Sequence, residues 1–159
     1  MTSLDIPDSV VSVRNYAFGG SKVTDVKIGN GVKGLGGDAF SSCQRLSSLT
    51  IGNEVSSIGE NAFRSCTALP SVTLPASVNE VGANAFKYCE SLSSVVVKGK
   101  TQTEAEALLT AAGLPDGCEI KTWNDASQEW FKAELSTAIS GLSESSTAAD
   151  IVAALKSLI

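Results

Sequence analysis

The sequence has no histidine and few charged residues. Its 159 residues include 12 Lys and Arg and 17 Asp and Glu, so that charged residues make up 18% of the chain, below the usual quarter. Without histidine the chain lacks the commonest general acid–base group of enzymes and a frequent zinc ligand. No two basic residues are adjacent and the net charge is −5, which argues against nucleic-acid binding because that needs a basic surface.

Signals for membranes, export and catalysis are missing as well. No apolar run reaches the length of a transmembrane helix, so no membrane insertion is expected. The N-terminus, Met1 to Leu4, has neither the basic nor the apolar region of a signal peptide. We therefore expect an intracellular or virion-borne protein, or a trimmed piece of an exported parent that would lie outside the cell or at its surface.

Catalytic motifs are equally absent. There is no G-x-S-x-G elbow, P-loop or dinucleotide fingerprint. A carboxylate pair such as Glu60 with Glu80 is conceivable, but both fall at solvated repeat positions, which favours a charged face. We predict no catalytic residue, no cofactor and no metal ligand, and expect that the chain is not an enzyme.

An internal repeat dominates the first hundred residues. The dipeptide Ala-Phe recurs at spacings of 22, 23 and 23 residues, and aliphatic residues recur in step with it. The Ala-Phe pairs are 17–18, 39–40, 62–63 and 85–86. Leu49-Thr50-Ile51 shows the alternation of a half-buried strand, and Gly52-Asn53 begins a turn after it. A fixed period of this length predicts a solenoid of stacked coils.

Each unit reads Leu-x-x-Leu-x-Ile, a turn, Val-x-x-Ile-Gly, and then Asn/Asp-Ala-Phe-x-x-Cys, with the fullest copies at 46–66 and 69–89. This pattern resembles the BspA-like leucine-rich repeat family over roughly residues 3–98. The resemblance implies an α/β-type repeat solenoid that is mainly β, a right-handed coil with parallel strands. Members resemble bacterial surface or adhesion proteins, protist surface proteins and some phage-encoded proteins, so the resemblance implies the fold more strongly than the ligand.

Three predictions concern the inside of the coils. The Phe side chains should stack about 5 Å apart, which is the strand spacing. Glycine recurs at positions 36, 59 and 82, where either a positive φ or close contact between coils would explain it. Tyr16 and Tyr88 lie beside the Ala-Phe corner and are expected to pack.

Cysteines recur at positions 43, 66 and 89, and Cys118 follows outside the repeats. A column of buried free thiols is the favoured interpretation. A disulfide between neighbouring coils is the alternative, although in-register stacking makes the Cβ vectors parallel, which is poor geometry for a bridge.

The outward positions of the strands form the predicted binding face. Small hydroxyl residues dominate it, and it lacks the Trp, Tyr and Arg of typical hot spots. A solvated Ser/Thr ladder is the simpler interpretation, and a ligand site on the concave face is the alternative. The candidate residues are Asp25, Lys27, Ser48, Thr50, Ser71 and Thr73.

After Gly99 the pattern changes to that of a terminal cap. Thr101 and Glu104 form a capping box, and an apolar stripe of helical spacing follows from Ala105 to Ala112. Gly113 is expected to end this helix at its C′ position. The segment 118–122 could add one last strand.

The spacing of apolar residues in the segment 123–159 predicts two amphipathic helices, 125–142 and 147–159, joined by a serine-rich loop. Helices of this length need a packing partner, which would be the rest of the monomer, a second copy or a larger assembly. The candidate assembly face comprises Trp130, Phe131, Leu135, Ile139, Leu142, Ile151, Leu155 and Leu158. The heptad spacing is too short to predict a coiled coil.

These observations predict three parts: a solenoid over 1–98, a cap over 99–122 and a helical tail over 123–159 for docking or oligomerisation. The first functional hypothesis is a non-catalytic scaffold for protein interaction or adhesion, with a protein partner of unknown identity. The alternative is a structural component of a phage virion or another assembly, joined through the C-terminal helices. The first coil begins at Leu4 and Ile6 without a preceding cap, which indicates either a partner there or a cut through a longer array.

Overall fold

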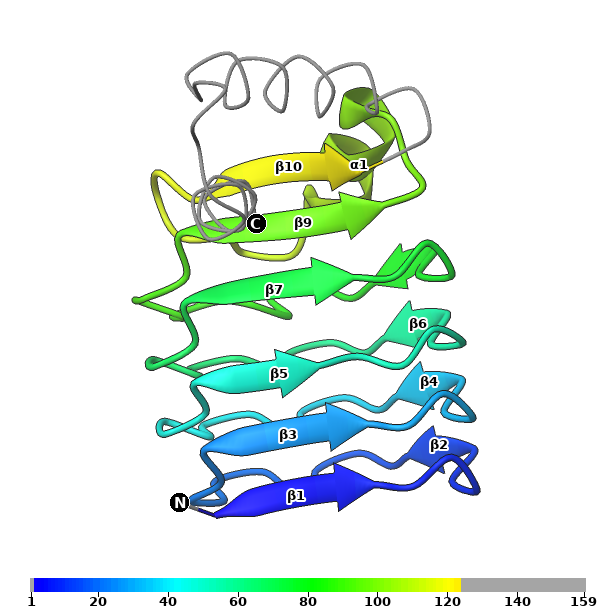
Figure 1. Cartoon of the computed structure of the whole chain (residues 1–159). Helices are drawn as coiled ribbons and strands as arrows, with labels where there is room; N and C mark the ends of the chain where they lie inside the picture. Colours follow the sequence, from blue (N-terminus) through cyan, green and yellow to red (C-terminus); the bar gives the residue numbers. More distant parts are fainter. Residues whose placement is uncertain (1, 124–159) are drawn as a thin grey trace, which may run out of the picture. The chain divides into compact units, whose positions relative to one another are not determined.

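The computed structural model describes residues 2–123. These residues form a mainly β solenoid of about five turns, and its strands are stacked in parallel (Figure 1). One series of strands comprises β1 (Ser3–Ile6), β3 (Asp25–Ile28), β5 (Ser48–Thr50), β7 (Ser71–Leu74), β9 (Ser94–Lys98) and β10 (Glu119–Trp123). A second series of two-residue strands comprises β2 (Ser12–Val13), β4 (Gly34–Leu35), β6 (Ser57–Ile58) and β8 (Glu80–Val81). The predicted leucine-rich-repeat coil is confirmed.

The strands pair in the register that the repeat predicts. Ser3 pairs with Asp25 and Asp25 with Ser48, and the short strands form a continuous ladder in the order β2-β4-β6-β8. The long strands form two sheets, β1-β3-β5 and β7-β9-β10. The break between these sheets falls between β5 and β7, and Pro70 lies just before β7. At the corresponding positions Ser47 and Ser93 donate backbone N–H groups to the preceding coil. A proline has no N–H to donate, which explains the break.

The core is a set of apolar columns that run through the stack. The rings of Phe18, Phe40, Phe63 and Phe86 lie 5.3, 5.4 and 5.6 Å apart in sequence order, in stacked orientation. The last three are completely buried. Among residues 2–123 no polar or charged residue is buried. The predicted aromatic stack is therefore confirmed.

The recurring glycines at 36, 59 and 82 are explained by close approach between coils. A Cβ on Gly59 would lie 2.6 Å from the carbonyl carbon of Gly36, and none of the three glycines has a positive φ. The left-handed residues lie two positions later instead, at Asp38, Asn61 and Asn84 with φ between 54 and 58°. Asp and Asn are the non-glycine residues that tolerate this region best.

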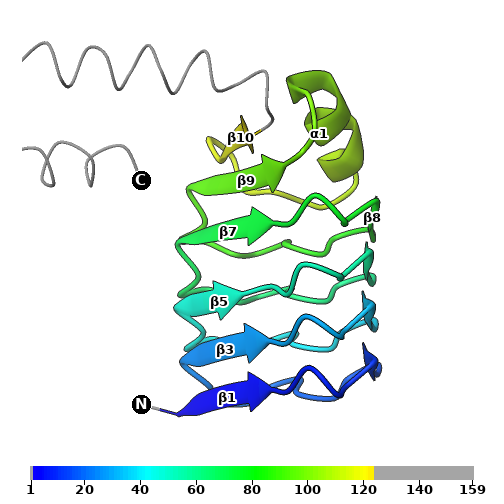
Figure 2. The ribbon, with the colours of Figure 1, turned by 45° about the vertical axis from the view of Figure 1, so that its right-hand side comes forward.

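The cap is built from helix α1 (Gln102–Leu109) and strand β10, which lie at the end of the stack opposite β1 (Figure 2). The predicted capping box is present: Thr101 N–H donates to Glu104 Oε2 at 2.8 Å, and Glu104 N–H donates to Thr101 Oγ1 at 3.4 Å. The predicted last strand is also present, since β10 pairs in parallel with β9.

The predicted end of the helix at Gly113 is wrong. The helix ends at Leu109 with Thr110 as its C-cap, and Gly113 follows in the left-handed region with φ of 71°. The early ending has a tertiary cause: the carbonyls of Ala111 and Ala112 accept N–H groups from Asn84 and Phe86 at 2.7 and 2.8 Å. These two carbonyls replace the backbone acceptors that a further repeat would supply, as Ala83 and Ala85 do for Asn61 and Phe63. The two predicted helices of the tail, with their assembly face, lie outside the described residues.

Candidate functional site

The predicted binding face is the outward side of the long strands. Paired registers place Asp25 beside Ser48 and Lys27 beside Thr50, and they place Ser71 and Thr73 beside Ser94 and Val96. All six candidate residues lie at outward positions; Asp25 is half-buried and the other five are exposed. The structure therefore gathers them in two parallel columns on one face, which we call the strand face.

Charge on the strand face is concentrated toward its two ends. Lys27 forms an ion pair with Asp5 at 3.9 Å, and Lys121 forms one with Glu119 at 3.1 Å. Asp25 accepts a hydrogen bond of 2.6 Å from the Thr24 hydroxyl. Exposed ion pairs of this kind contribute little to stability, about 0–1 kcal/mol each. The middle of the face is neutral and offers hydroxyl donors and acceptors.

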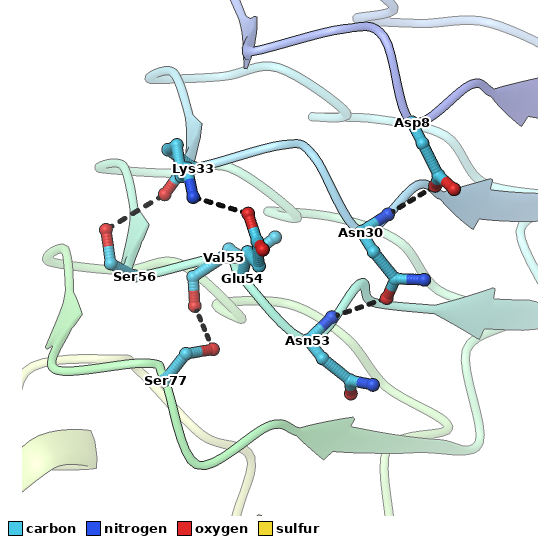
Figure 3. Close-up of polar contacts among 8 residues, drawn as sticks. All are labelled: Asp8, Asn30, Lys33, Asn53, Glu54, Val55, Ser56 and Ser77. Carbon is cyan, nitrogen blue, oxygen red and sulfur yellow. Dashed lines mark hydrogen bonds and ion pairs between the residues drawn. The ribbon is translucent and has the colours of Figure 1, made fainter.

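Polar side chains outside the strand face mostly join one coil to the next. Asp8 Oδ1 accepts a hydrogen bond from the Asn30 N–H at 2.6 Å, and Asn30 Oδ1 accepts one from the Asn53 N–H at 2.9 Å (Figure 3). Ser56 and Ser77 donate hydroxyl hydrogen bonds to backbone carbonyls of the preceding coil, at 3.0 and 2.7 Å. These groups are occupied by the scaffold, so they are poor candidates for holding a ligand.

The cysteines are structural in the same sense. Cys43, Cys66 and Cys89 are completely buried and unpaired, and the Cys66 thiol donates to the Phe40 carbonyl at 3.2 Å. Burial raises the pKa of Cys66 strongly and that of Cys89 to about 11. A raised pKa keeps the thiol protonated and unreactive at neutral pH. The prediction of free thiols is confirmed.

Chemistry-bearing groups do not converge among residues 2–123. No group of three Cys, Asp or Glu residues there could hold a metal ion. Glu60 and Glu80 are exposed, in agreement with the predicted charged face. An open hollow lined by Val13, Arg14, Asn15 and Gly36 contains no nucleophile beside a base.

The prediction that Tyr16 and Tyr88 pack is wrong. Tyr16 is 70% exposed and Tyr88 is 52% exposed. Both occupy left-handed backbone positions, with φ of 59 and 61°. The signal that could have predicted their exposure is the residue type at the matching positions of the other coils. These are Asp or Asn for Tyr16, and Gly or Ser for Tyr88.

The stacked parallel strands, the aromatic column and the polar strand face define a leucine-rich-repeat solenoid. The chain belongs to the BspA type leucine rich repeat region family, whose six copies match residues 1–108. Leucine-rich repeat families of this kind are generally non-enzymatic, protein-binding scaffolds. No helix within residues 2–123 is long and apolar enough to cross a membrane.

Solved structures show the same fold. A leucine-rich repeat protein from Bacteroides capillosus ATCC 29799 is 32% identical with a TM-score of 0.58, and the match covers 62% of this chain and 78% of that one. A leucine rich cell surface protein from Faecalibacterium prausnitzii A2-165 is 22% identical (TM-score 0.63), with 81% of this chain and 34% of that chain covered. The pneumococcal vaccine antigen PcpA is 24% identical (TM-score 0.54), with 65% and 31% covered. The chain thus spans about a third of the last two. No curated protein matches it.

Proposed function

We propose that this chain is a non-catalytic adhesion scaffold that recognises a protein partner on its strand face. The observation that carries the proposal is the strand face itself. Its central side chains, Ser48, Thr50, Ser71 and Thr73, are exposed, whereas many polar groups elsewhere on the coils are used in contacts between coils. A rigid surface with exposed hydroxyls is suited to recognition, because little entropy is lost on binding.

The solved relatives support a surface role. One is described as a cell surface protein and another as a vaccine antigen, and both are longer than this chain. We infer from them that the chain acts outside the cell or at its surface. The virion alternative depends on the C-terminal helices, which lie outside the described residues, so it stays a prediction.

The proposal is tested by introducing a tryptophan on the strand face and, as a control, a tryptophan on the short-strand side of the solenoid. The full chain is screened against immobilised extracellular proteins, and binding is then compared for Thr50→Trp on β5 and Ser12→Trp on β2, both of which replace exposed hydroxyl residues. Thr50→Trp is expected to abolish binding to the partner found, and Ser12→Trp to preserve it. Binding that survives Thr50→Trp would show that recognition lies on another surface.

A further inference from the structure

Two cations share one exposed aromatic ring at the Ala-Phe corner of the third and fourth coils. The Arg64 guanidinium carbon lies 5.3 Å from the centroid of the Tyr88 ring, and Lys87 Nζ lies 5.2 Å from it. Both distances are within the range of cation–π attraction. We call Arg64, Lys87 and Tyr88 the corner patch; it precedes β9 in the chain and is separate from the strand face.

The backbone of the corner places the two cations one above the other. Ser42 N–H donates to the Arg64 carbonyl at 2.7 Å, and Ser65 N–H donates to the Lys87 carbonyl at 2.8 Å. Arg64 and Lys87 therefore occupy the same column in successive coils, where like charges repel. Within residues 2–123 no carboxylate forms an ion pair with either of them. Glu90 is exposed and only two residues from Tyr88, and it too forms no ion pair with Arg64 or Lys87 within the described residues.

Tyr88 occupies a position that the other coils fill with small residues. The matching residues are Gly20, Ser42 and Ser65, and all four have φ between 58 and 69°. A bulky side chain is strained in this region, and strain retained in a fold is a reason to look for a function. The ring stays 52% exposed, so core packing does not account for it.

We propose that the corner patch binds an acidic segment of a partner protein. A guanidinium offers paired donors to a carboxylate, an ammonium adds a second positive charge, and the tyrosine ring supplies a rigid apolar contact beside them. Arg and Tyr are also the residue types that concentrate binding energy at protein interfaces. The proposal shares with the proposed function only the protein nature of the partner, since it concerns a second surface.

The test measures binding of a fluorescein-labelled decaglutamate peptide to the full chain by fluorescence anisotropy, at low salt so that screening is weak. The variant R64S/K87S should weaken binding about tenfold, which corresponds to the loss of two exposed charge contacts. The variant K27S/K121S removes the same charge from the strand face and should change binding less than about twofold. Circular dichroism checks that both variants remain folded.

A third variant isolates the ring. Tyr88→Ser restores the residue found in neighbouring coils and leaves both cations, so it should weaken binding about threefold, as expected for one exposed cation–π contact. Unchanged binding in this variant would overturn the role of the ring.

Three results would overturn the proposal itself: no binding by the unaltered chain, equal weakening by the two double variants, or binding of dextran sulfate but not of decaglutamate through Arg64 and Lys87. The last result would assign the corner patch to a sulfated glycan. Thr50→Trp should leave decaglutamate binding unchanged. Failure of the corner patch would thus be distinguishable from failure of the strand face.

Discussion

The two ends of the solenoid expose the same kinds of residue to different degrees. At the C-terminal end Phe86 is completely buried, because the chain continues into α1 and the Ala112 carbonyl accepts the Phe86 N–H. At the N-terminal end Phe18, which occupies the same column, is only half-buried. Its ring stacks on Phe40 alone among the described residues. Val10 is likewise half-buried, although Val32, Val55 and Val78 in its column are completely buried.

The difference shows that the burial of a side chain in a solenoid depends on whether a neighbouring coil covers it. Phe18 and Val10 of the first coil are less buried than the matching residues inside the stack, although Ile6 and Val13 of the same coil are buried, as expected of a stack whose repeats contact their nearest neighbours. A single repeat cannot bury its own apolar side, so the cap at one end is as much a part of the core as the repeats.

The largest effect is expected from removing a ring in the middle of the stack. Phe63→Ala should lower the free energy of unfolding by about 3–5 kcal/mol, the usual cost of deleting a fully buried phenylalanine. Phe18→Ala should cost about half of that or less, because the lost contact area is smaller. Urea denaturation of both variants measures the difference. Equal losses would mean that Phe18 is as enclosed as Phe63.

The cap should be the next most sensitive region. Leu109 in α1 is 3% exposed, and Leu109→Ala should cost about 2–3 kcal/mol. Val11 in the first coil is 65% exposed, and Val11→Ala should change the free energy of unfolding by less than about 0.5 kcal/mol. The same denaturation experiment applies. A small loss in Leu109→Ala would show that the solenoid is stable without its helix.

A smaller effect is expected at the start of α1. Thr101→Ala removes the N-cap hydroxyl and should cost about 1 kcal/mol. In this variant the helical signal in circular dichroism should be lost at a lower temperature than in the unaltered chain. Thr103→Ala, a change in the same turn that keeps the N-cap, is the control and should have a smaller effect.

The capping box also predicts a pH dependence. The backbone N–H and hydroxyl of Thr101 lower the pKa of Glu104 below its ordinary value of 4.5. A carboxyl group whose folded pKa is lowered stabilises the fold above the unfolded pKa, and this contribution is lost as the pH falls through the folded value. Thermal unfolding of the chain and of Glu104→Gln should therefore differ above pH 4.5 and converge in stronger acid. A difference that grows in acid would contradict the assignment.

The smallest change should be a gain. Tyr16 holds a left-handed conformation in a column otherwise filled by Asp38, Asn61 and Asn84. Tyr16→Asn should therefore raise the free energy of unfolding by about 0.5–1 kcal/mol. Tyr16→Phe keeps the strain and serves as the control, with no expected change. A loss of stability in Tyr16→Asn would show that the exposed ring makes contacts worth more than the strain.

Much of the fold could be predicted because the repeat is periodic. The strand register, the aromatic stack, the thiol column and the capping box all follow from side-chain spacing along the chain. The strand face could be located for the same reason, since alternation assigns each side chain to one face or the other. Its binding role stays a prediction.

Other features depend on contacts that spacing does not encode. The helix ends at Leu109 because Ala111 and Ala112 must turn to meet Asn84 and Phe86, which lie 27 and 26 residues earlier. The corner patch was missed because Arg64 and Tyr88 are 24 residues apart and their contact arises only when one coil is stacked on the next.

The class of fold and the composition of each column follow from the amino-acid sequence, because periodicity requires only local spacing and the pairing of like positions. The depth to which each column is buried at the two ends, and the residue at which the helix stops, depend on the folded stack. So does the meeting of two cations on one tyrosine. The physical reason is the same in each case: hydrogen bonds, burial and charge contacts between coils depend on which neighbour is present, and no single repeat carries that information.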